Sequence, residues 1–263
     1  MTDTHTDDTD DINDARHPGH PPIVSHDDWR AARIALLADE KAYTRAGDAL
    51  SARRRRLPMV AVTEPYDFRG PDGAATLRDM FGDHRQLIVY HFMFDPSWEA
   101  GCPSCTHLSD EVGPGHLAHL ADSDTAYVAI SRAPIEKIQR YRTERGWTFP
   151  WYSSFGTSFN HDFHVTLDPS VAPVEYNFKD RAELEALGHE FDDGDSSELP
   201  GISTFMRLGD DIFHTYSTFA RGAESIGGSH YLLDLTVYGR QQTFEDSPTG
   251  WPQQPTYGDV TES

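Results

Sequence analysis

One apolar segment, QLIVYHFMF at residues 86–94, most constrains what this chain can fold into. It has the length of a strand and the unbroken apolar character of a strand buried inside a sheet. After a short loop come Cys-Pro-Ser-Cys and a helical pattern, CTHLSDEVGPGHLAHLA. TAYVAISRA predicts a second buried strand, and PIEKIQRYRTERG predicts a helix with proline at its start. Strands that alternate with helices predict an α/β fold with a central sheet flanked by helices.

The whole chain divides into four predicted parts. Residues 1–21 are an acidic tail of Asp, Thr and His that we expect to be disordered. Residues 22–58 are expected to form an N-terminal helical arm, residues 59–240 the main domain and residues 241–263 an extended tail. The arm is predicted because apolar residues recur along it at helical spacing, namely Trp29, Leu36, Tyr43, Ala46 and Leu50.

Two hairpins and a last helix are predicted within the main domain. MVAVTEPYDFRGPDGAATL contains a Gly-Pro-Asp-Gly turn, GISTFMRLGDDIFHTYSTF turns at Gly-Asp-Asp, and SIGGSHYLLDLTVYG has a helical pattern. The polarity of HTYST is unusual for a strand and indicates a site or an interface. Side chains alternate along a strand, so we expect His214 and Tyr216 on one face and Thr215 and Ser217 on the other.

The composition limits the partners and the compartment. A net charge of −21 argues against nucleic acid and anionic membranes, because both attract clustered positive charge. The one basic run, RRRR at 53–56, is interpreted as the solvated end of the helical arm. No apolar run approaches the roughly 18–20 residues that span a bilayer. The acidic N-terminus lacks the apolar core of a signal peptide, so we expect a cytoplasmic protein. The arm offers a surface through which the chain could form a homo-oligomer.

Both cysteines of the chain lie in GCPSCTH, residues 101–107. In the cytoplasm a close cysteine pair is more often catalytic or metal-binding than a structural disulfide. The order strand, loop, Cys-Pro-Ser-Cys, helix places Cys102 at a helix N-terminus, where free N–H groups and the helix dipole stabilise a thiolate. Cys105 follows one turn later on the same face, and Pro103 fits the first turn of a helix. The pattern therefore predicts a reactive thiol pair.

Four segments resemble a family of thioredoxin-like proteins catalogued as domain of unknown function number 899. They are HPPIVSHDDW, YHFMFDPSWEAGCPSC, FPWYSS and FHTYSTFARG, and the resemblance covers roughly residues 20–240. It implies a thioredoxin-like fold, with a mixed central sheet flanked by helices, and kinship to the peroxide-reducing branch of the superfamily. It implies no settled reaction.

The sequence departs from that superfamily at three places. Peroxiredoxins carry Pro-x-x-x-Thr-x-x-Cys, whereas here Pro96 precedes Cys102 by six residues with no threonine between them. Thioredoxins place a cis-proline opposite the pair, but Ile202 or Ser203 occupies that place and Pro200 lies just before it. Thioredoxin-fold copper chaperones supply a histidine before the same strand, and SSELPGI has none. The first departure argues against a conventional peroxidase, and the missing proline removes one obstacle to metal binding.

Several further residues are candidates for the same site. His91, near the end of the apolar strand, is a candidate base, thiolate partner or metal ligand. Trp98, Ser203 and Tyr216 are candidate supporting residues, and Phe94 and Trp151 could wall an aromatic pocket or belong to the core. His107 is expected on the far side of its helix from the pair. His161 and His164, three apart, are a weak metal candidate.

Three functions fit these observations. The leading one is a thiol–disulfide redox protein in which Cys102 attacks a disulfide or an oxidised small substrate and Cys105 resolves the intermediate, with no cofactor required. The substrate is then a small molecule or a protein disulfide. The alternative is a copper-type oxidoreductase, with copper or another thiophilic metal on Cys102, Cys105 and His91. The third is a non-catalytic binding domain that has kept the fold.

Overall fold

The computed structural model describes residues 19–191 and 196–253. The chain separates into two compact units, one of residues 47–228 and one made of the chain before residue 47 and after residue 228. The predicted acidic tail, residues 1–21, lies outside the described residues except for its last three. Among the described helices, none is long and apolar enough to cross a membrane.

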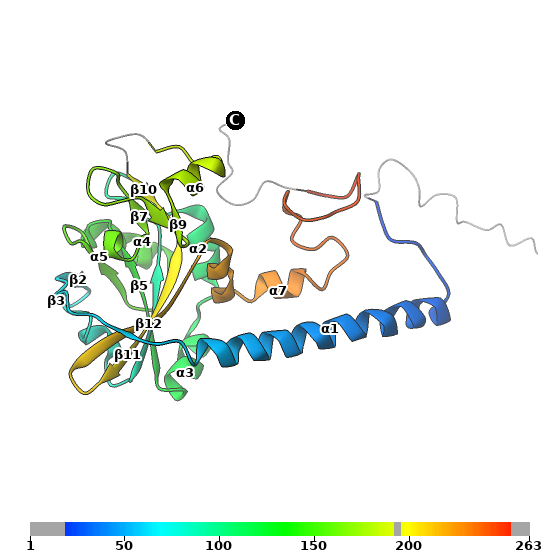
Figure 1. The fold of residues 1–263 in the computed structure, drawn as a ribbon, viewed down its shortest axis with the longest axis horizontal. Helices are drawn as coiled ribbons and strands as arrows, with labels where there is room; N and C mark the ends of the chain where they lie inside the picture. Colours follow the sequence, from blue (N-terminus) through cyan, green and yellow to red (C-terminus); the bar gives the residue numbers. More distant parts are fainter. Residues whose placement is uncertain (1–18, 192–195, 254–263) are drawn as a thin grey trace, which may run out of the picture. The chain divides into compact units, whose positions relative to one another are not determined.

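The larger unit is built on a mixed sheet of eight strands in the order β1-β12-β11-β4-β5-β6-β2-β3 (Figure 1). The neighbours β4, β5 and β6 are parallel, while β11 is antiparallel to both β4 and β12. The strands are β1 (Val60–Ala61), β2 (Phe68–Gly70), β3 (Gly73–Ala75), β4 (Gln86–His91), β5 (Thr125–Ser131), β6 (Trp151–Ser153), β11 (Gly201–Leu208) and β12 (Asp211–Phe219).

This arrangement is thioredoxin-like. Strands β4 and β5 are parallel and joined through helices, and the antiparallel hairpin β11–β12 extends the sheet beside β4. The apolar segment predicted as a buried strand is the central β4. The expected mixed sheet with flanking helices and an N-terminal helix is therefore confirmed.

Each face of the sheet has its own core. We call the cysteine face the one that carries Tyr90, Phe92, Cys102 and Cys105, which is covered by helices α2 (Pro103–Asp110), α3 (Pro114–Asp122), α4 (Ile135–Arg145) and η3 (Ala220–Ile226). We call the histidine face the one that carries Leu87, Val89 and His91, which is covered by η2 (Asp79–Phe81), α5 (Phe159–Asp162) and α6 (Arg181–Ala186). Two small antiparallel pairs lie outside the main sheet, namely β7 (Thr166–Leu167) with β10 (Ser197–Glu198) and β8 (Glu175–Tyr176) with β9 (Lys179–Asp180).

Local sequence explains where the main helices begin and end. Pro103 and Pro114 stand at the first turns of α2 and α3, where a missing N–H costs nothing. Helix α4 ends at Gly146, whose φ of 69° is the left-handed conformation that glycine adopts without strain. The order of strands and helices in this region follows the expectation from sequence.

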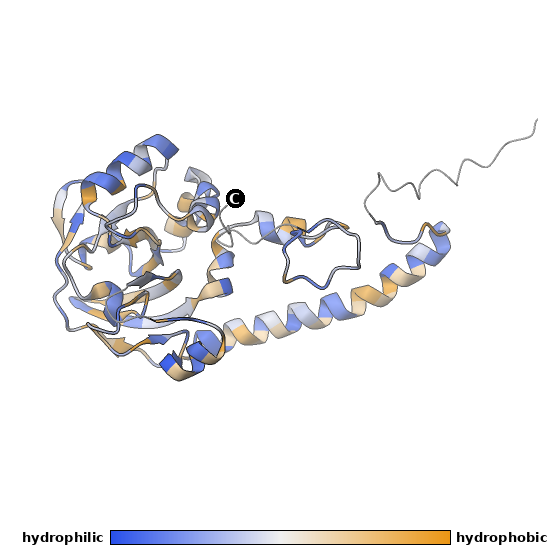
Figure 2. Ribbon diagram, turned by 90° about the horizontal axis from the view of Figure 1, so that it is seen from above, coloured by the Kyte–Doolittle hydropathy of each residue, from blue (hydrophilic) through white to orange (hydrophobic). Residues whose placement is uncertain are grey.

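The first long helix, α1 (His26–Arg54), is also present as predicted, with the Ser25 hydroxyl accepting the Asp28 N–H at 3.2 Å. None of its side chains is buried. Figure 2 colours the helix by hydropathy and shows apolar residues recurring along it. At the other end, the predicted last helix is mostly wrong, because α7 covers only Ser229–Leu233. The preceding Gly227 is extended, and two consecutive glycines favour leaving a helix there.

Candidate active site

The loop from β4 to α2 folds back on the strand end. The N–H of Cys102 donates to the carbonyl of Met93 at 3.1 Å, which closes the loop. Gly101 is required here, because a Cβ at that position would lie 2.6 Å from the ring of Phe92. The chain therefore brings Cys102 to the cap of α2, where its extended backbone (φ −53°, ψ 131°) precedes the first helical residue.

Cys102 is placed to ionise easily. Its pKa is lowered to about 7, chiefly by the hydrogen bond that the Cys105 thiol donates to its sulfur. The backbone N–H groups of Cys105 and Ser104 lower this pKa further, while burial opposes the shift. These are the free N–H groups of a helix N-terminus. Cys102 therefore lies where the sequence pattern predicted, and its pKa is shifted in the direction expected there.

Cys105 has the opposite character. It is fully buried, and burial raises the pKa of its thiol well above the usual range, with the sulfur of Cys102 adding to the effect. The hydroxyls of Tyr90 and Tyr127 are buried in the same core, and neither has a nitrogen or oxygen partner. The pKa of Tyr90 is raised well above its usual range, first by burial and then by the neighbouring Cys105. Cys105 therefore stays protonated beside an ionised Cys102.

The pair can act as a nucleophile with a proton-bearing partner. The ionised sulfur of Cys102 can attack an electrophilic sulfur, and the buried thiol of Cys105 is already hydrogen-bonded to it. The first turn that holds both is pinned by Thr106, whose hydroxyl donates to the Cys102 carbonyl at 2.8 Å and contacts the Tyr141 hydroxyl at 2.9 Å. Both cysteines are free thiols in the structure.

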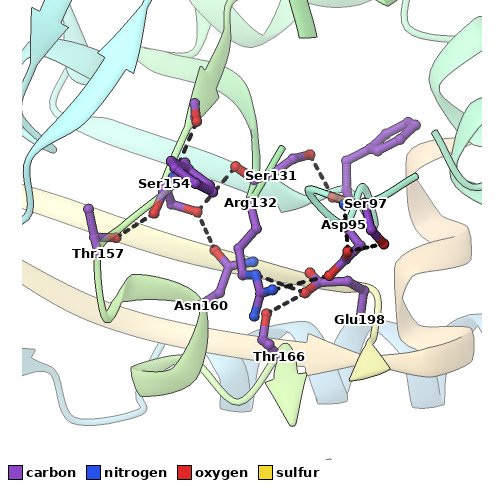
Figure 3. Close-up of polar contacts among 12 residues, drawn as sticks. Asp95, Ser97, Ser131, Arg132, Ser154, Thr157, Asn160, Thr166 and Glu198 are labelled. Atoms are coloured by element: carbon purple, nitrogen blue, oxygen red, sulfur yellow. Dashed lines mark hydrogen bonds and ion pairs between the residues drawn. The ribbon is translucent and has the colours of Figure 1, made fainter. Parts of the chain in front are cut away.

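A partly buried arginine ties the cysteine loop to β10. Arg132, directly after β5, lies 3.1 Å from Asp95 of the loop and 3.2 Å from Glu198, as Figure 3 shows. Thr166 donates to Glu198 at 2.9 Å, and Ser97 donates to Asp95 at 2.6 Å. Burial, more than any other cause, raises the pKa of Glu198 to about 7. This cluster was missed by sequence reasoning, and the available signal was a charged residue at the carboxyl end of a predicted central strand.

His91 is not brought to the cysteine pair. Its side chain lies on the histidine face, stacked on Phe163 with ring centroids 5.8 Å apart, whereas both cysteines belong to the opposite core. Its Nε2 is 2.8 Å from the hydroxyl of Ser203, and burial, with a smaller effect of His214, lowers its pKa to about 3. The reason is strand alternation, since Tyr90 is the residue of β4 that faces the thiols. Ser203 accompanies His91 and is likewise on the far face.

Comparison with known proteins places the chain in a family. The profile of a family described as bacterial proteins of unknown function (DUF899) matches residues 18–257. The chain belongs to this family. None of the curated proteins matches the sequence.

Similar solved structures include two peroxiredoxin-type proteins. Peroxiredoxin Q from Xanthomonas campestris is 13% identical with a TM-score of 0.43, over 65% of this chain and 94% of that one. Peroxidoxin BcpB from Mycobacterium tuberculosis is 15% identical with a TM-score of 0.40, over 65% of this chain and 95% of that one. The thioredoxin-like fold of the DUF899 protein follows from its own strand order and strand directions.

The other supporting candidates of the DUF899 protein lie at separate places. Trp98 is in the cysteine loop, 37% exposed, and its carbonyl accepts from Lys137 at 2.9 Å. Tyr216 lies under the guanidinium of Arg54, 5.3 Å from the ring centroid. Ile202 packs in the core that contains both cysteines, and Phe94 and Trp151 are fully buried there as core residues.

The remaining histidines are dispersed. His161 lies on α5, where burial lowers its pKa, whereas His164 lies beyond the helix, 4.0 Å from Glu175. His107 is half-buried in the last turn of α2. Within residues 19–191 and 196–253, no group of three His, Cys, Asp or Glu side chains could hold a metal ion. The third ligand of the copper-type alternative, His91, is on the other face of the sheet.

The predicted alternation of HTYST was wrong because β12 contains a bulge. The pairing with β11 shifts between Thr204 and Phe205, which leaves Thr215 as an extra residue. His214 and Ser217 therefore lie together on the histidine face, with Nε2 and Oγ 2.7 Å apart. Two residues that strict alternation would separate are thus hydrogen-bonded partners.

Proposed function

We propose that this chain is a thiol–disulfide redox protein in which Cys102 is the nucleophile and Cys105 the resolving thiol. The observation that carries the proposal is the opposite character of the two thiols. Cys102, 7% exposed, has a pKa of about 7 at the cap of a helix, and Cys105, with no exposed surface, has a raised pKa. A thiol with a pKa near ambient pH combines a large thiolate fraction with good nucleophilicity.

The reaction begins with the Cys102 thiolate attacking one sulfur of a disulfide. A bond forms between Cys102 Sγ and that sulfur, the substrate S–S bond breaks, and the leaving thiolate takes up a proton. Cys105 then loses its proton and attacks Sγ of Cys102. The second substrate thiolate leaves and is protonated, so two electrons pass to the substrate and the protein ends as a Cys102–Cys105 disulfide.

The same geometry explains the order of the two steps. Part of the raised pKa of Cys105 comes from the hydrogen bond and the negative charge of Cys102. Once Cys102 is in a mixed disulfide, that negative charge is gone, and the Cys105 thiol ionises more readily. The resolving thiol is therefore held back until the first step is complete. No cofactor enters this scheme.

Trapping the intermediate tests the proposal. Cys105→Ser protein, incubated with glutathione disulfide, should accumulate a mixed disulfide on Cys102 that mass spectrometry detects as one added glutathione. Wild type should instead lose two protons and form the internal disulfide. Cys102→Ser protein should do neither, and Ser104→Ala, between the two thiols, should behave as wild type.

Two results would contradict the proposal. One is that glutathione adds slowly and at the same rate to Cys105→Ser and Cys102→Ser protein, which fits a binding domain with inert thiols. The other is stoichiometric copper on anaerobically purified protein that is lost in Cys102→Ser, which fits the metal alternative.

A further inference from the structure

A cavity of about 370 Å³ opens on the histidine face, away from the cysteine pair. Its walls come from β1 and the residues after it, from β12, from the end of α5 and from the β8–β9 turn. The volume is within the range of about 300–1,000 Å³ typical of small-molecule sites. The cavity is therefore large enough for a small organic ligand.

The charged groups around the cavity are acidic. Glu64, Asp162 and Glu175 line it together with His164, whose ring nitrogen lies 4.0 Å from Glu175, and no lysine or arginine does so among the described residues. Asp162 accepts hydrogen bonds from Tyr66 at 2.9 Å and from Ser158 at 2.7 Å, both on Oδ2. That arrangement leaves Oδ1 for a ligand. The cavity therefore favours a positively charged occupant.

Two histidines line the cavity, and His214 on the inner wall adds no positive charge. Burial lowers the pKa of His214, and its Nε2 is bonded to Ser217 at 2.7 Å. Ser217 is 2.8 Å from Ser203, which in turn is bonded to the buried His91. This chain of neutral groups stabilises the inner wall, so His214 does not offset the charge of Glu64 and Asp162.

Aromatic rings form much of the remaining surface. Tyr66, Phe163 and Phe219 line the cavity and are buried, whereas Phe178 lines it with 75% of its surface exposed. The ring of Phe178 meets that of Phe219 edge-on, with centroids 5.8 Å apart. The backbone of Phe178 has a φ of 61°, a left-handed conformation that is costly for a bulky residue. The β8–β9 turn thus holds an exposed aromatic ring at the cavity.

We propose that this cavity binds a small organic cation, whose ammonium group lies against the aromatic rings and is neutralised by the carboxylates Glu64 and Asp162. Aromatic faces attract cations through the ring quadrupole, and quaternary ammonium groups are recognised by aromatic cages of this kind. A bare metal ion does not fit the same residues, because no three acidic, cysteine or histidine side chains among the described residues converge on one point.

The cation site is independent of the proposed thiol chemistry. It lies on the histidine face, and none of its lining residues belongs to the core around Cys102 and Cys105. A failure of the thiol proposal therefore leaves the cation proposal testable, and the reverse also holds. Alkylation measures the reactivity of the thiols, and calorimetry measures binding in the cavity.

Isothermal titration of the full chain with choline tests the site directly. The control ligand is 3,3-dimethylbutan-1-ol, which has the shape of choline but no charge. Choline should bind about tenfold more tightly than this alcohol, and tetramethylammonium and ethanolamine should also bind. Equal binding of choline and the alcohol would overturn the proposal. The proposal would also be overturned if none of the three cations bound with a Kd of about 10 mM or lower.

Three variants locate the binding. Glu64→Gln and Phe178→Leu should each weaken choline binding about three- to tenfold, since each removes one attraction for the cation. Both residues are exposed, so neither change disturbs the core. Asp67→Asn removes an exposed carboxylate of the same segment that does not line the cavity, and it should bind choline as wild type does. Equal effects of Glu64→Gln and Asp67→Asn would show only a general charge effect and overturn the site.

Discussion

The two faces of the central sheet hold polar groups of different kinds. On the cysteine face, two thiols share one hydrogen bond and have pKa values shifted in opposite directions. On the histidine face, two histidines and two serines form a hydrogen-bonded chain, and the pKa of each histidine is lowered by burial. The first arrangement favours ionisation of one member, and the second suppresses it. Tyr90 and His91, adjacent in β4, belong to different systems, so nearness in sequence to the cysteines does not indicate a shared site.

The largest expected effect is confined to the cysteine face. Cys102→Ser should reduce the rate of iodoacetamide alkylation at pH 7 by about 100-fold or more, because Cys105 is buried and its raised pKa leaves little thiolate. Choline binding at the cavity should not change. A variant that still alkylates rapidly would show that Cys105 is the reactive thiol and would reverse the roles assigned to the pair.

The next effect should be confined to the histidine face. Ser203→Ala leaves the buried His91 with no partner on Nε2, while its Nδ1 already has none. An unpaired buried polar group costs about 1–3 kcal/mol of unfolding free energy, which urea denaturation can measure. Cys102 should alkylate at the wild-type rate. A changed rate would mean that the two faces are coupled through β4.

A smaller effect distinguishes the two causes of the Cys102 pKa. Cys105→Ala removes the thiol hydrogen bond and keeps the backbone N–H groups, so the pKa should rise from about 7 by about one unit. Alkylation at pH 7 should then slow about fivefold, and the midpoint of its pH profile should move upward. An unchanged midpoint would assign the whole shift to the helix N-terminus.

The same lowered pKa has a consequence for stability. A thiol whose pKa is lower in the folded state than in the unfolded state stabilises the fold above the unfolded pKa. This contribution is lost as the pH falls through about 7. The reduced wild type should therefore gain stability relative to Cys102→Ser between pH 7 and pH 9, measured by urea denaturation under reducing conditions. A constant difference over that range would contradict the lowered pKa.

The smallest effect is expected outside both faces. Trp29 on α1 is 55% exposed, so Trp29→Ser should change the unfolding free energy by less than about 0.5 kcal/mol. If the helical arm forms a homo-oligomer, sedimentation velocity should detect a dimer of the wild type. Trp29→Ser should weaken that dimer. A monomer at all concentrations would remove the arm as an oligomer surface.

The parts of the fold that the sequence predicts are those with local signals. The unbroken apolar run of β4, the prolines at Pro103 and Pro114 and the spacing of the cysteines each act within a few residues. They are enough to place Cys102 at a helix cap with a lowered pKa. The Gly-Pro-Asp-Gly turn is likewise local and joins β2 to β3 as expected.

The features that sequence reasoning missed depend on pairing between distant segments. His91 is hydrogen-bonded to Ser203, which is 112 positions away in the sequence. Arg132 contacts both Asp95 and Glu198 only because β5, the cysteine loop and β10 come together in the fold. The bulge in β12 carries no glycine or proline that would reveal it. Strict alternation was therefore the natural assumption, and it gave the wrong partners for His214.

The bulge at Thr215 also bears on how the length of this chain can vary. Because Thr215 is the residue without a partner in the ladder, its removal would leave His214 opposite Phe205 and Tyr216 opposite Thr204, as they are now. In a strand without a bulge, removal of one residue would instead turn part of the strand over. A variant of this chain without Thr215 can therefore keep the same two faces, so β12 tolerates a change of length that a regular strand would not accommodate.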